Sequence, residues 1–483
     1  WNSTTGTIRF GVPETILPYD TFLVQFSVSN PMSGQQSQNV GIAGYIGSTN
    51  ILGRAAMQNA GGNAAPLLVA GFVTKLVAQS NVSASSLNTI SVTFSTYSAL
   101  LRNESASIIV SGLLGSTTPS GIITLKSSNG TRFTLIFGTQ ALWNNDTGSL
   151  LLTVLSDSQG GAIYVFSFEI MNPSEGQNST SVSIVSTGTQ SALQTMDTAT
   201  GNFAPMLVAD FLVGALGQSD VSQGANNTIT VTLQTRVSLT KGTVVTISGL
   251  TGSVVPDTDS LQVMTIKSPS SDAIHFHSQG SWNRMNGMVR FVVYESTQPR
   301  ADYVLNFTLR NPFVGQSSPS PIQISSGGSV AIAPRTMTTR GDNSAPLLVA
   351  GFLRTLVHQN AVDSVAYASS AQGISERPIN ITISFSTTCS VTVDSHIVLR
   401  NLVRSSTEST QSIPLACKPP GFVSMSGVWV REAGILRLPV LANTIPNQTY
   451  SCIVTLNRPL QAQSPPTLTL EVNGTDISRI EPG

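Results

Sequence analysis

The chain has 483 residues with a formal net charge of zero, and only 10% of these residues are charged, far below the roughly 25% of ordinary soluble domains. A neutral surface of this kind offers no electrostatic attraction to nucleic acid or to an anionic membrane, so neither is predicted as a partner. The longest apolar run, around residues 64–73, is broken by Pro66 and Gly71, so no membrane insertion is predicted either. The length allows about three or four domains.

The first stretch of the chain matches only part of a domain. Its markers are Trp1, an alternating apolar row at Val24, Phe26 and Val28, and the turn Asn30-Pro31-Met32-Ser33-Gly34-Gln35. Strict alternation predicts a strand with one buried face, but this stretch has no first-half strands to cover that face. Residues 1–61 are therefore predicted to be the second half of a β-sandwich repeat. Because a bare apolar row and an open strand edge are unfavourable, either an upstream part of the same chain or the matching half of a neighbouring molecule would complete it.

A second marker, Asn-x-Ala-Pro-[Leu/Met]-Leu-Val-Ala-x-Phe, divides the rest of the chain into repeats. It occurs at residues 63–72, 202–211 and 343–352, and its prolines are 139 and 141 residues apart. We therefore predict β-sandwich repeats at residues 62–200, 201–342 and 343–483. Because proline keeps the residue before it extended, the short linkers that run into Ala-Pro are expected to be semi-rigid.

Within each repeat the apolar period is two. The alternating rows are Ile90/Val92/Phe94, Phe166/Phe168/Ile170, Ile229/Val231/Leu233, Leu305/Phe307/Leu309, Ile381/Ile383/Phe385 and Cys452/Val454/Leu456. Each repeat has seven or eight such short strands and no helical stripe longer than two turns. This pattern predicts an all-β chain of tandem antiparallel β-sandwich (Ig-like) domains, with about 140 residues per repeat.

The last repeat diverges from the others. It has an insertion around residues 362–377 and contains all three cysteines. Cys389 ends its second predicted strand, Cys417 ends the fourth, and Cys452 opens a strand two further on. If the strands alternate up and down, Cys389 and Cys417 lie at one pole, which predicts a Cys389–Cys417 disulfide and a buried, reduced Cys452.

Eleven Asn-x-Ser/Thr sequons predict N-glycosylation of a secreted, extracellular or cell-surface protein. They lie at Asn2, Asn81, Asn103, Asn129, Asn145, Asn178, Asn226, Asn306, Asn380, Asn447 and Asn473. Strand parity provides a test. Asn306 lies between inward residues of its row, and Asn380 precedes the inward Ile381, so both side chains are expected to face solvent.

No catalytic, cofactor-binding or metal-binding residue is predicted, and the chain is not expected to be an enzyme. His275 and His277 flank Phe276 and would project from one strand face. No carboxylate or cysteine lies near them in sequence, so packing or solvent-facing roles are favoured over a metal site. No pairing of a nucleophile with a base recurs in the repeats.

Two further motifs have the residue types of a metal site or a recognition site. Asp257 and Asp259 form an Asp-x-Asp pair, which supplies too few carboxylates for a calcium site. The tripeptide Arg340-Gly341-Asp342, a receptor-attachment motif, lies in a predicted linker. Its counterparts in the other linkers, residues 60–62 and 200–202, are also glycine-centred, so the chemistry of a turn explains the tripeptide.

Taken together, the motifs N-x-A-P-[LM]-L-V-A-x-F, N-T-I-x-V-T, I-S-G-L-x-G-S and N-P-x-x-G-Q resemble tandem Ig-like β-sandwich repeats of algal and other protist surface proteins. These include flagellar-hair and cell-surface filament types. The resemblance implies a structural subunit of an extracellular filament or coat, whose partners are copies of itself, neighbouring repeats and attached glycans. The alternative is an adhesin, a glycan- or receptor-binding surface protein that uses one specialised repeat.

Overall fold

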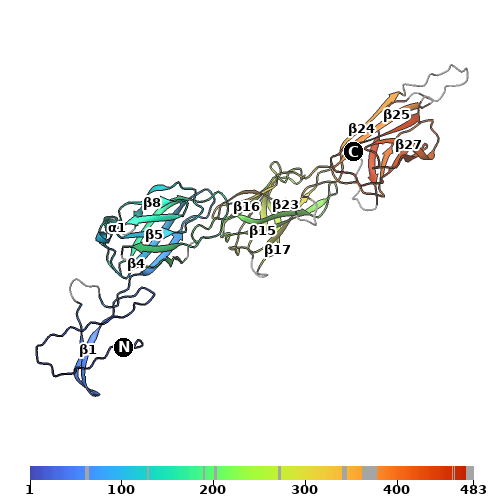
Figure 1. Ribbon diagram of the computed structural model, residues 1–483. Helices are drawn as coiled ribbons and strands as arrows, with labels where there is room; N and C mark the ends of the chain where they lie inside the picture. The colour runs from blue at the N-terminus through green and yellow to red at the C-terminus, as the bar shows by residue number, and fades with distance from the viewer. Residues whose placement is uncertain are drawn as a thin grey trace.

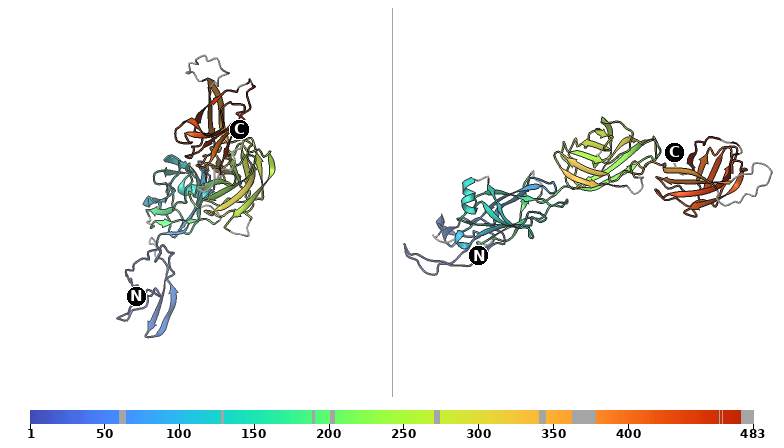
Figure 2. Two further views of the ribbon diagram at one scale, coloured as in Figure 1. Left: turned by 90° about the vertical axis from the view of Figure 1, so that its right-hand side faces the viewer. Right: turned by 90° about the horizontal axis from the view of Figure 1, so that it is seen from above.

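The structure, a computed structural model, describes residues 1–59, 65–127, 130–188, 191–200, 204–269, 274–339, 345–361, 378–459, 461 and 463–474. Strands dominate this part of the chain, and three β-sandwiches follow one another in an extended row (Figure 1). Figure 2 shows the same row from the side of the third sandwich and from above. The predicted all-β fold class with tandem antiparallel sandwiches is confirmed.

The first sandwich packs two sheets face to face. One sheet has the strand order β13 (Asp197–Thr198), β3 (Phe72–Gln79), β4 (Leu87–Thr96), β10 (Tyr164–Met171) and β7 (Lys126–Ser127). The other has the order β12 (Gln194–Thr195), β11 (Ser183–Thr187), β5 (Ser107–Ser111), β9 (Ser149–Thr153), β8 (Gln140–Asn144) and β6 (Gly121–Thr124). Neighbouring strands are antiparallel except for β13 and β3, which run parallel.

One short helix lies in a stretch where the apolar pattern did not predict one. Helix α1 (Gly130–Phe137) follows β7, and a 3-10 turn lies at Arg102–Glu104. The helix buries Phe133 and Phe137, whose rings contact Phe166 and Phe94 respectively. The run Phe-Thr-Leu-Ile-Phe places its two aromatic residues four apart, which puts them on the same face of a helix.

The second sandwich forms one continuous ladder of strands. Its order is β22 (Ile332–Thr336), β21 (Gln323–Gly327), β16 (Val244–Ser248), β19 (Met288–Val292), β18 (Gln279–Asn283), β17 (Thr258–Lys267), β20 (Tyr303–Arg310), β15 (Asn226–Thr235), β14 (Phe211–Gln218) and β23 (Thr338–Thr339). The ladder is continuous because β17 pairs with β18 through its first half and with β20 through its second half. The end strand β23 runs parallel to β14, as β13 does to β3.

The third sandwich has the same kind of crossing strand. Its order is β24 (Phe352–Ala361), β25 (Pro378–Thr387), β30 (Tyr450–Asn457), β27 (Thr410–Lys418), β28 (Ser426–Val430), β29 (Ile435–Pro439), β26 (His396–Arg400) and β31 (Thr469–Asn473). Here β27 pairs with both β28 and β30. In the described part of the chain, no strand pairs with the outer edge of β24.

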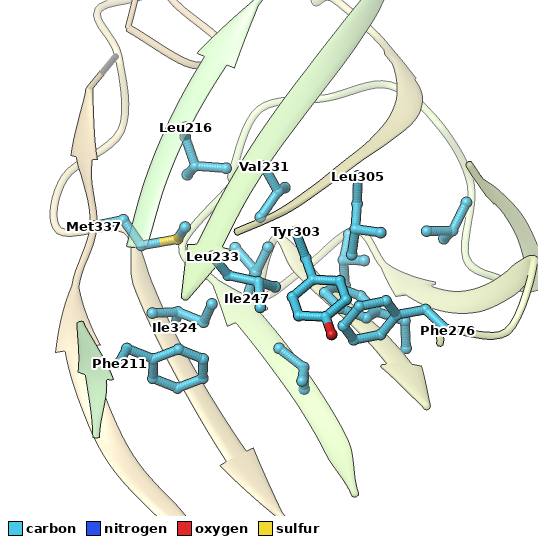
Figure 3. Packing of buried hydrophobic residues seen from close by; sticks show 14 of the residues in the cluster. Phe211, Leu216, Val231, Leu233, Ile247, Phe276, Tyr303, Leu305, Ile324 and Met337 are labelled. Atoms are coloured by element: carbon cyan, nitrogen blue, oxygen red, sulfur yellow. The ribbon is translucent and has the colours of Figure 1, made fainter. Parts of the chain in front are cut away.

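Each core contains one buried tryptophan at the place expected from the repeats. The indole Nε1 atoms of Trp143, Trp282 and Trp429 each donate a hydrogen bond of 3.0 Å to a backbone carbonyl, that of Thr118, Val255 and Thr407 respectively. A buried aromatic ring that keeps its polar atom bonded contributes large apolar area without leaving an unsatisfied donor. The alternating rows are buried as predicted, and Figure 3 shows Val231, Leu233 and Leu305 inside the second core.

The N-terminal residues do not form the strand predicted at residues 24–28. Strands β1 (Gly41–Ile46) and β2 (Thr49–Ala56) make a hairpin, whereas residues 8–40 contain no strand. Val24, Phe26 and Val28 are 48%, 52% and 39% exposed. The matching strand β10 is bonded to β4 and β7, which both come from the first half of its repeat. Among residues 1–59, no strand takes the place of β4 or β7 beside residues 24–28.

Candidate functional site: the joints between repeats

The Ala-Pro segments form joints at which each sandwich receives a side chain from the following linker. Leu67, Met206 and Leu347 follow the three prolines and adopt φ of 57°, 58° and 54°. This left-handed conformation is uncommon for a side chain of this kind and costs about 1–2 kcal/mol. Met206 and Leu347 are fully buried, in the cores of the first and second sandwich respectively. We call Met206 the plug of the first joint, between the first and second sandwiches, and Leu347 the plug of the second joint, between the second and third.

The residues just after the plug belong to the next sandwich. Ala209 and Phe211 lie in the second core, and Ala350 lies in the third. Only two residues therefore separate a side chain buried in one core (Met206 or Leu347) from a side chain buried in the next (Ala209 or Ala350). Such a short connection leaves little freedom for two neighbouring sandwiches to rotate independently.

Buried and half-buried glutamine side chains hold the backbone of the plug. At the first joint, Gln79 at the end of β3 donates to the Leu207 carbonyl (2.8 Å) and accepts from the Met206 amide (2.8 Å). Gln177, from the Gly-Gln motif, donates to the Met206 carbonyl (2.8 Å). At the second joint, Gln218 and Gln316 donate to the Leu348 and Leu347 carbonyls, each at 2.9 Å. Because Gln79 and Gln218 are buried, breaking one of their bonds would leave a costly unsatisfied group.

The Asn-Pro motif anchors a loop that reaches forward into the next sandwich. Asn172 is buried and donates to the carbonyls of Asn81 and Ser83, on either side of Val82. Val82 lies in the core of the second sandwich, and its carbonyl accepts a hydrogen bond of 2.7 Å from Ala209.

The second joint repeats this arrangement. Asn311 donates to the carbonyls of Asp220 and Ser222, and Val221 between them packs against the third core. The Val221 carbonyl accepts from Ala350 at 2.7 Å. Residues therefore cross each joint in both directions, the plug backward and the valine forward.

Close backbone contact also requires glycine at the Gly-Gln motif. A Cβ added to Gly315 would lie 2.6 Å from the Gly351 Cα, and one added to Gly34 would lie 2.7 Å from the Gly71 Cα. The first joint has Asp210 in place of the second glycine. Its carboxylate takes two hydrogen bonds from Arg236, at 2.8 and 3.0 Å, in a bidentate ion pair. The position opposite the glycine of the Gly-Gln motif is therefore held either by a second glycine in direct backbone contact or by an aspartate that is paired with an arginine.

Two predicted glycosylation sites lie at the joints. The side-chain Oδ1 of Asn178 accepts hydrogen bonds from the guanidinium groups of Arg236 (2.6 Å) and Arg300 (2.5 Å) of the following repeat. The side-chain Oδ1 of Asn447 accepts a hydrogen bond from the Ser317 hydroxyl of the preceding repeat at 3.1 Å. Both asparagines are exposed.

The other sequons lie on the surface or near it. None of the sequon asparagines that the structure describes is buried, and Asn129 lies outside the described residues. Asn306 and Asn380 are partly exposed, between neighbours that are buried. The predicted strand parity at these two positions is confirmed, whereas glycosylation itself stays a prediction.

The predicted Cys389–Cys417 disulfide is wrong. Cys417 on β27 lies directly opposite Cys452 on β30, and these two sulfurs are bonded. The prediction assumed a simple up-and-down order of strands, whereas β27 crosses between sheets and ends beside β30. Cys389 is the free cysteine; burial raises the pKa of its thiol, and a hydrogen bond from Thr388 opposes that rise.

The expectation that His275 and His277 share one face is also wrong. His275 and Phe276 are both buried and His277 is exposed, because this stretch forms only an isolated bridge rather than a regular strand. The His275 ring packs edge-on against Tyr303, and its Nδ1 lies 3.1 Å from the Ser296 carbonyl oxygen. Within the described residues, no group of three His, Cys, Asp or Glu side chains is placed to hold a metal ion.

The Asp-x-Asp pair and the Arg-Gly-Asp tripeptide are the last two motifs that the sequence raised as candidate sites. Asp257 accepts hydrogen bonds from the Arg284 amide (2.7 Å) and the Asn283 side chain (3.3 Å), so it caps a turn. The tripeptide at residues 340–342 lies outside the described residues. In the described part of the chain, no helix is both long enough and apolar enough to cross a membrane.

Comparison with solved structures gives matches of low overall similarity. The serine-rich repeat protein from Streptococcus agalactiae is 11% identical, with 53% of this chain and 89% of that chain covered and a TM-score of 0.16. The B domain of a biofilm associated protein is 10% identical, with 53% and 81% covered and a TM-score of 0.16. The type II cohesin dyad from the adaptor scaffoldin of Acetivibrio cellulolyticus is 11% identical, with 53% and 88% covered and a TM-score of 0.15.

No protein-family model and no curated protein matches the chain. The structural matches do not assign it to a family, because their TM-scores are all well below 0.5.

Proposed function

We propose that the chain is a structural subunit of an extracellular, glycosylated filament or cell-surface coat. The observation that carries the proposal is the shared core at each joint, where Met206 and Leu347 enter the preceding sandwich and Val82 and Val221 enter or pack against the next. A chain of sandwiches fixed in this way keeps its direction over its length. A fibre or a coat requires a fixed orientation between neighbouring domains. A protein whose domains act independently does not.

The surface supports the same role. Charged residues make up only 10% of the chain and the net charge is zero, so little repulsion keeps copies apart. The sequons that the structure describes are accessible or partly accessible, and glycans on them would solvate a surface that is poor in charge. Catalysis has no part in this proposal. The motif resemblance to algal and protist fibre proteins points in the same direction and remains a resemblance.

The test is electron microscopy of the native specimen, combined with N-glycosidase treatment. Filaments or a continuous coat that antibodies against the chain decorate would support the proposal, together with a mass loss on deglycosylation. Single, dispersed rods that bind a glycan or receptor would overturn it in favour of the adhesin alternative. The variant Asn306→Gln provides the matched control for glycosylation, because it removes one mid-strand sequon and should leave the neighbouring core intact.

A further inference from the structure

The first and last strands of the first two sandwiches lie side by side and run in the same direction. Asp197 and Thr198 of β13 pair with Leu76 and Val77 of β3, and Thr338 and Thr339 of β23 pair with Ala215 and Leu216 of β14. In each case the first strand carries the chain into the sandwich and the short parallel strand carries it out. The rest of the sandwich lies between them in sequence.

This parallel pairing decides how tension along the chain would act. Tension pulls the first strand backward and the exit strand forward, so two parallel strands are forced to slide past each other. Their hydrogen bonds and side-chain contacts then bear the load together. An antiparallel pair pulled apart at one end instead loses its bonds one after another.

Several contacts bind the exit segment to β3 in the first sandwich. The Lys75 ammonium lies 2.8 Å from the Asp197 carboxylate, and the Ala199 amide donates to the Val77 carbonyl at 3.0 Å. Gln79, at the end of the same strand, grips the backbone of Met206 and Leu207. The load can therefore pass from β3 to the next repeat without crossing the core between the two sheets.

A buried methionine fixes each exit segment to the core. Met196 and Met337 both lie nine residues before the proline of the next joint, and both are buried. Figure 3 shows Met337 on the side of the second core that holds Phe211, Leu216 and Ile324. Sliding of the exit strand would pull this side chain from the core, which adds an apolar cost to the broken hydrogen bonds.

We propose that the parallel pairs β3–β13 and β14–β23, together with the glutamine-bound plugs, are clamps that make the first two sandwiches resistant to tension along the chain. This second property deepens the proposed structural role, since a filament or coat subunit carries tension. It is measured on the isolated chain, however, so the absence of filaments in micrographs would overturn the proposed function and leave the clamp untouched.

The third sandwich provides an internal comparison. No strand among the described residues pairs with the outer edge of β24, and Gln359, which takes the place of Gln79 and Gln218, is exposed. Ile379 replaces the buried Asn88 and Asn227 that orient those glutamines. Among the described residues, the glutamine contacts that hold the plug in the first two sandwiches therefore have no counterpart in the third, so we expect it to resist tension less.

The experiment is single-molecule stretching of the intact chain, held at its two ends and pulled at constant speed. We expect two high-force unfolding events and one low-force event, each high-force event releasing on the order of 400–500 Å of chain at 3.3–3.6 Å per residue. The disulfide identifies the third sandwich, because it locks a loop with a sequence separation of 35. A reducing agent should lengthen that event, and no other, by about 120 Å.

Two sets of variants test the clamp itself. Ala199→Pro removes the amide that bonds Val77, so one of the two high-force events should fall to the low-force class. Lys75→Met breaks the ion pair on the load path, and Lys126→Met is its matched control, because the Lys126–Glu169 pair of 2.7 Å joins the antiparallel strands β7 and β10. Only Lys75→Met should lower the unfolding force.

The outcomes are decisive even if Ala199→Pro weakens folding. Equal unfolding forces for all three sandwiches would overturn the proposal, as would a third sandwich stronger than the others. Equal effects of Lys75→Met and Lys126→Met would also overturn it, because an ion pair off the load path should not matter. If hydrogen exchange shows that Ala199→Pro destabilises the unloaded first sandwich, the lysine pair alone decides.

Discussion

The burial of the plug predicts which sandwich a linker substitution destabilises, and so distinguishes sandwiches that share residues from sandwiches that fold independently. Met206 lies in the linker between two repeats, yet its side chain is fully buried in the first core. Its neighbour Leu207 packs against the second core instead. Truncation of Met206 should therefore weaken the first sandwich, and truncation of Leu207 should weaken the second.

The size of the effect follows from the burial. Truncation of a fully buried methionine to alanine costs about 2–5 kcal/mol, depending on how far the site collapses. Each 1.4 kcal/mol is a factor of ten in an opening equilibrium, so protection of the first sandwich should fall by about 30-fold or more. Leu207 is only partly buried, and its truncation should cost less, about 1–2 kcal/mol.

The assay is hydrogen exchange followed by mass spectrometry, read separately on peptides from β4 and from β15. Met206→Ala should accelerate exchange in β4, and Leu207→Ala should accelerate it in β15, because stable strands exchange through opening of their own folding unit. If Met206→Ala left β4 protection unchanged, or weakened both strands equally, the assignment of the plug to the first core would be refuted.

Two titratable groups give further predictions. Burial raises the pKa of the Cys389 thiol, so this thiol should be alkylated more slowly than a free thiol at pH 8; mass mapping should find it as the one cysteine outside the Cys417–Cys452 bond. Burial likewise raises the pKa of Tyr303, against the hydrogen bond from Gln298. The unfolded tyrosine therefore ionises first, and the stability of the second sandwich should fall as the pH rises above about 10. Tyr303→Phe should lack this part of the pH dependence, which urea unfolding at pH 8 and 11 would measure.

The alternation of apolar residues was sufficient to predict the strands. Ile90, Val92 and Phe94 are fully buried. An apolar period of two that is bounded by turn residues predicts a strand with one buried face. The same signal failed at residues 24–28, where the alternation is present and the partner strands are not. A strand is a property of its neighbours as well as of its own residues.

The disulfide and the plug could not be predicted from local sequence for different reasons. Pairing of Cys417 with Cys452 depends on β27 crossing between sheets, which is a property of the whole topology. The left-handed backbone at Met206 and Leu347 is disfavoured for such residues, so no propensity argument would place it there. A signal was nevertheless visible, because Gln79 and Gln218 recur seven residues after Phe72 and Phe211, the first residues of β3 and β14.

The plug also implies that the folding unit is out of phase with the sequence repeat. A fragment that ends at residue 200 follows the predicted boundary, but it lacks Met206 and the backbone that Gln79 holds. A fragment of residues 65–209 should therefore be more stable than one of residues 65–200, by about 2–5 kcal/mol for the methionine alone. Urea unfolding of the two fragments, followed by Trp143 fluorescence, measures the difference. The fragment of residues 65–209 with Met206→Ala is the control, and it should lose most of the gain. Equal midpoints for all three would show that each repeat folds within its own sequence boundary, and that the joints merely touch.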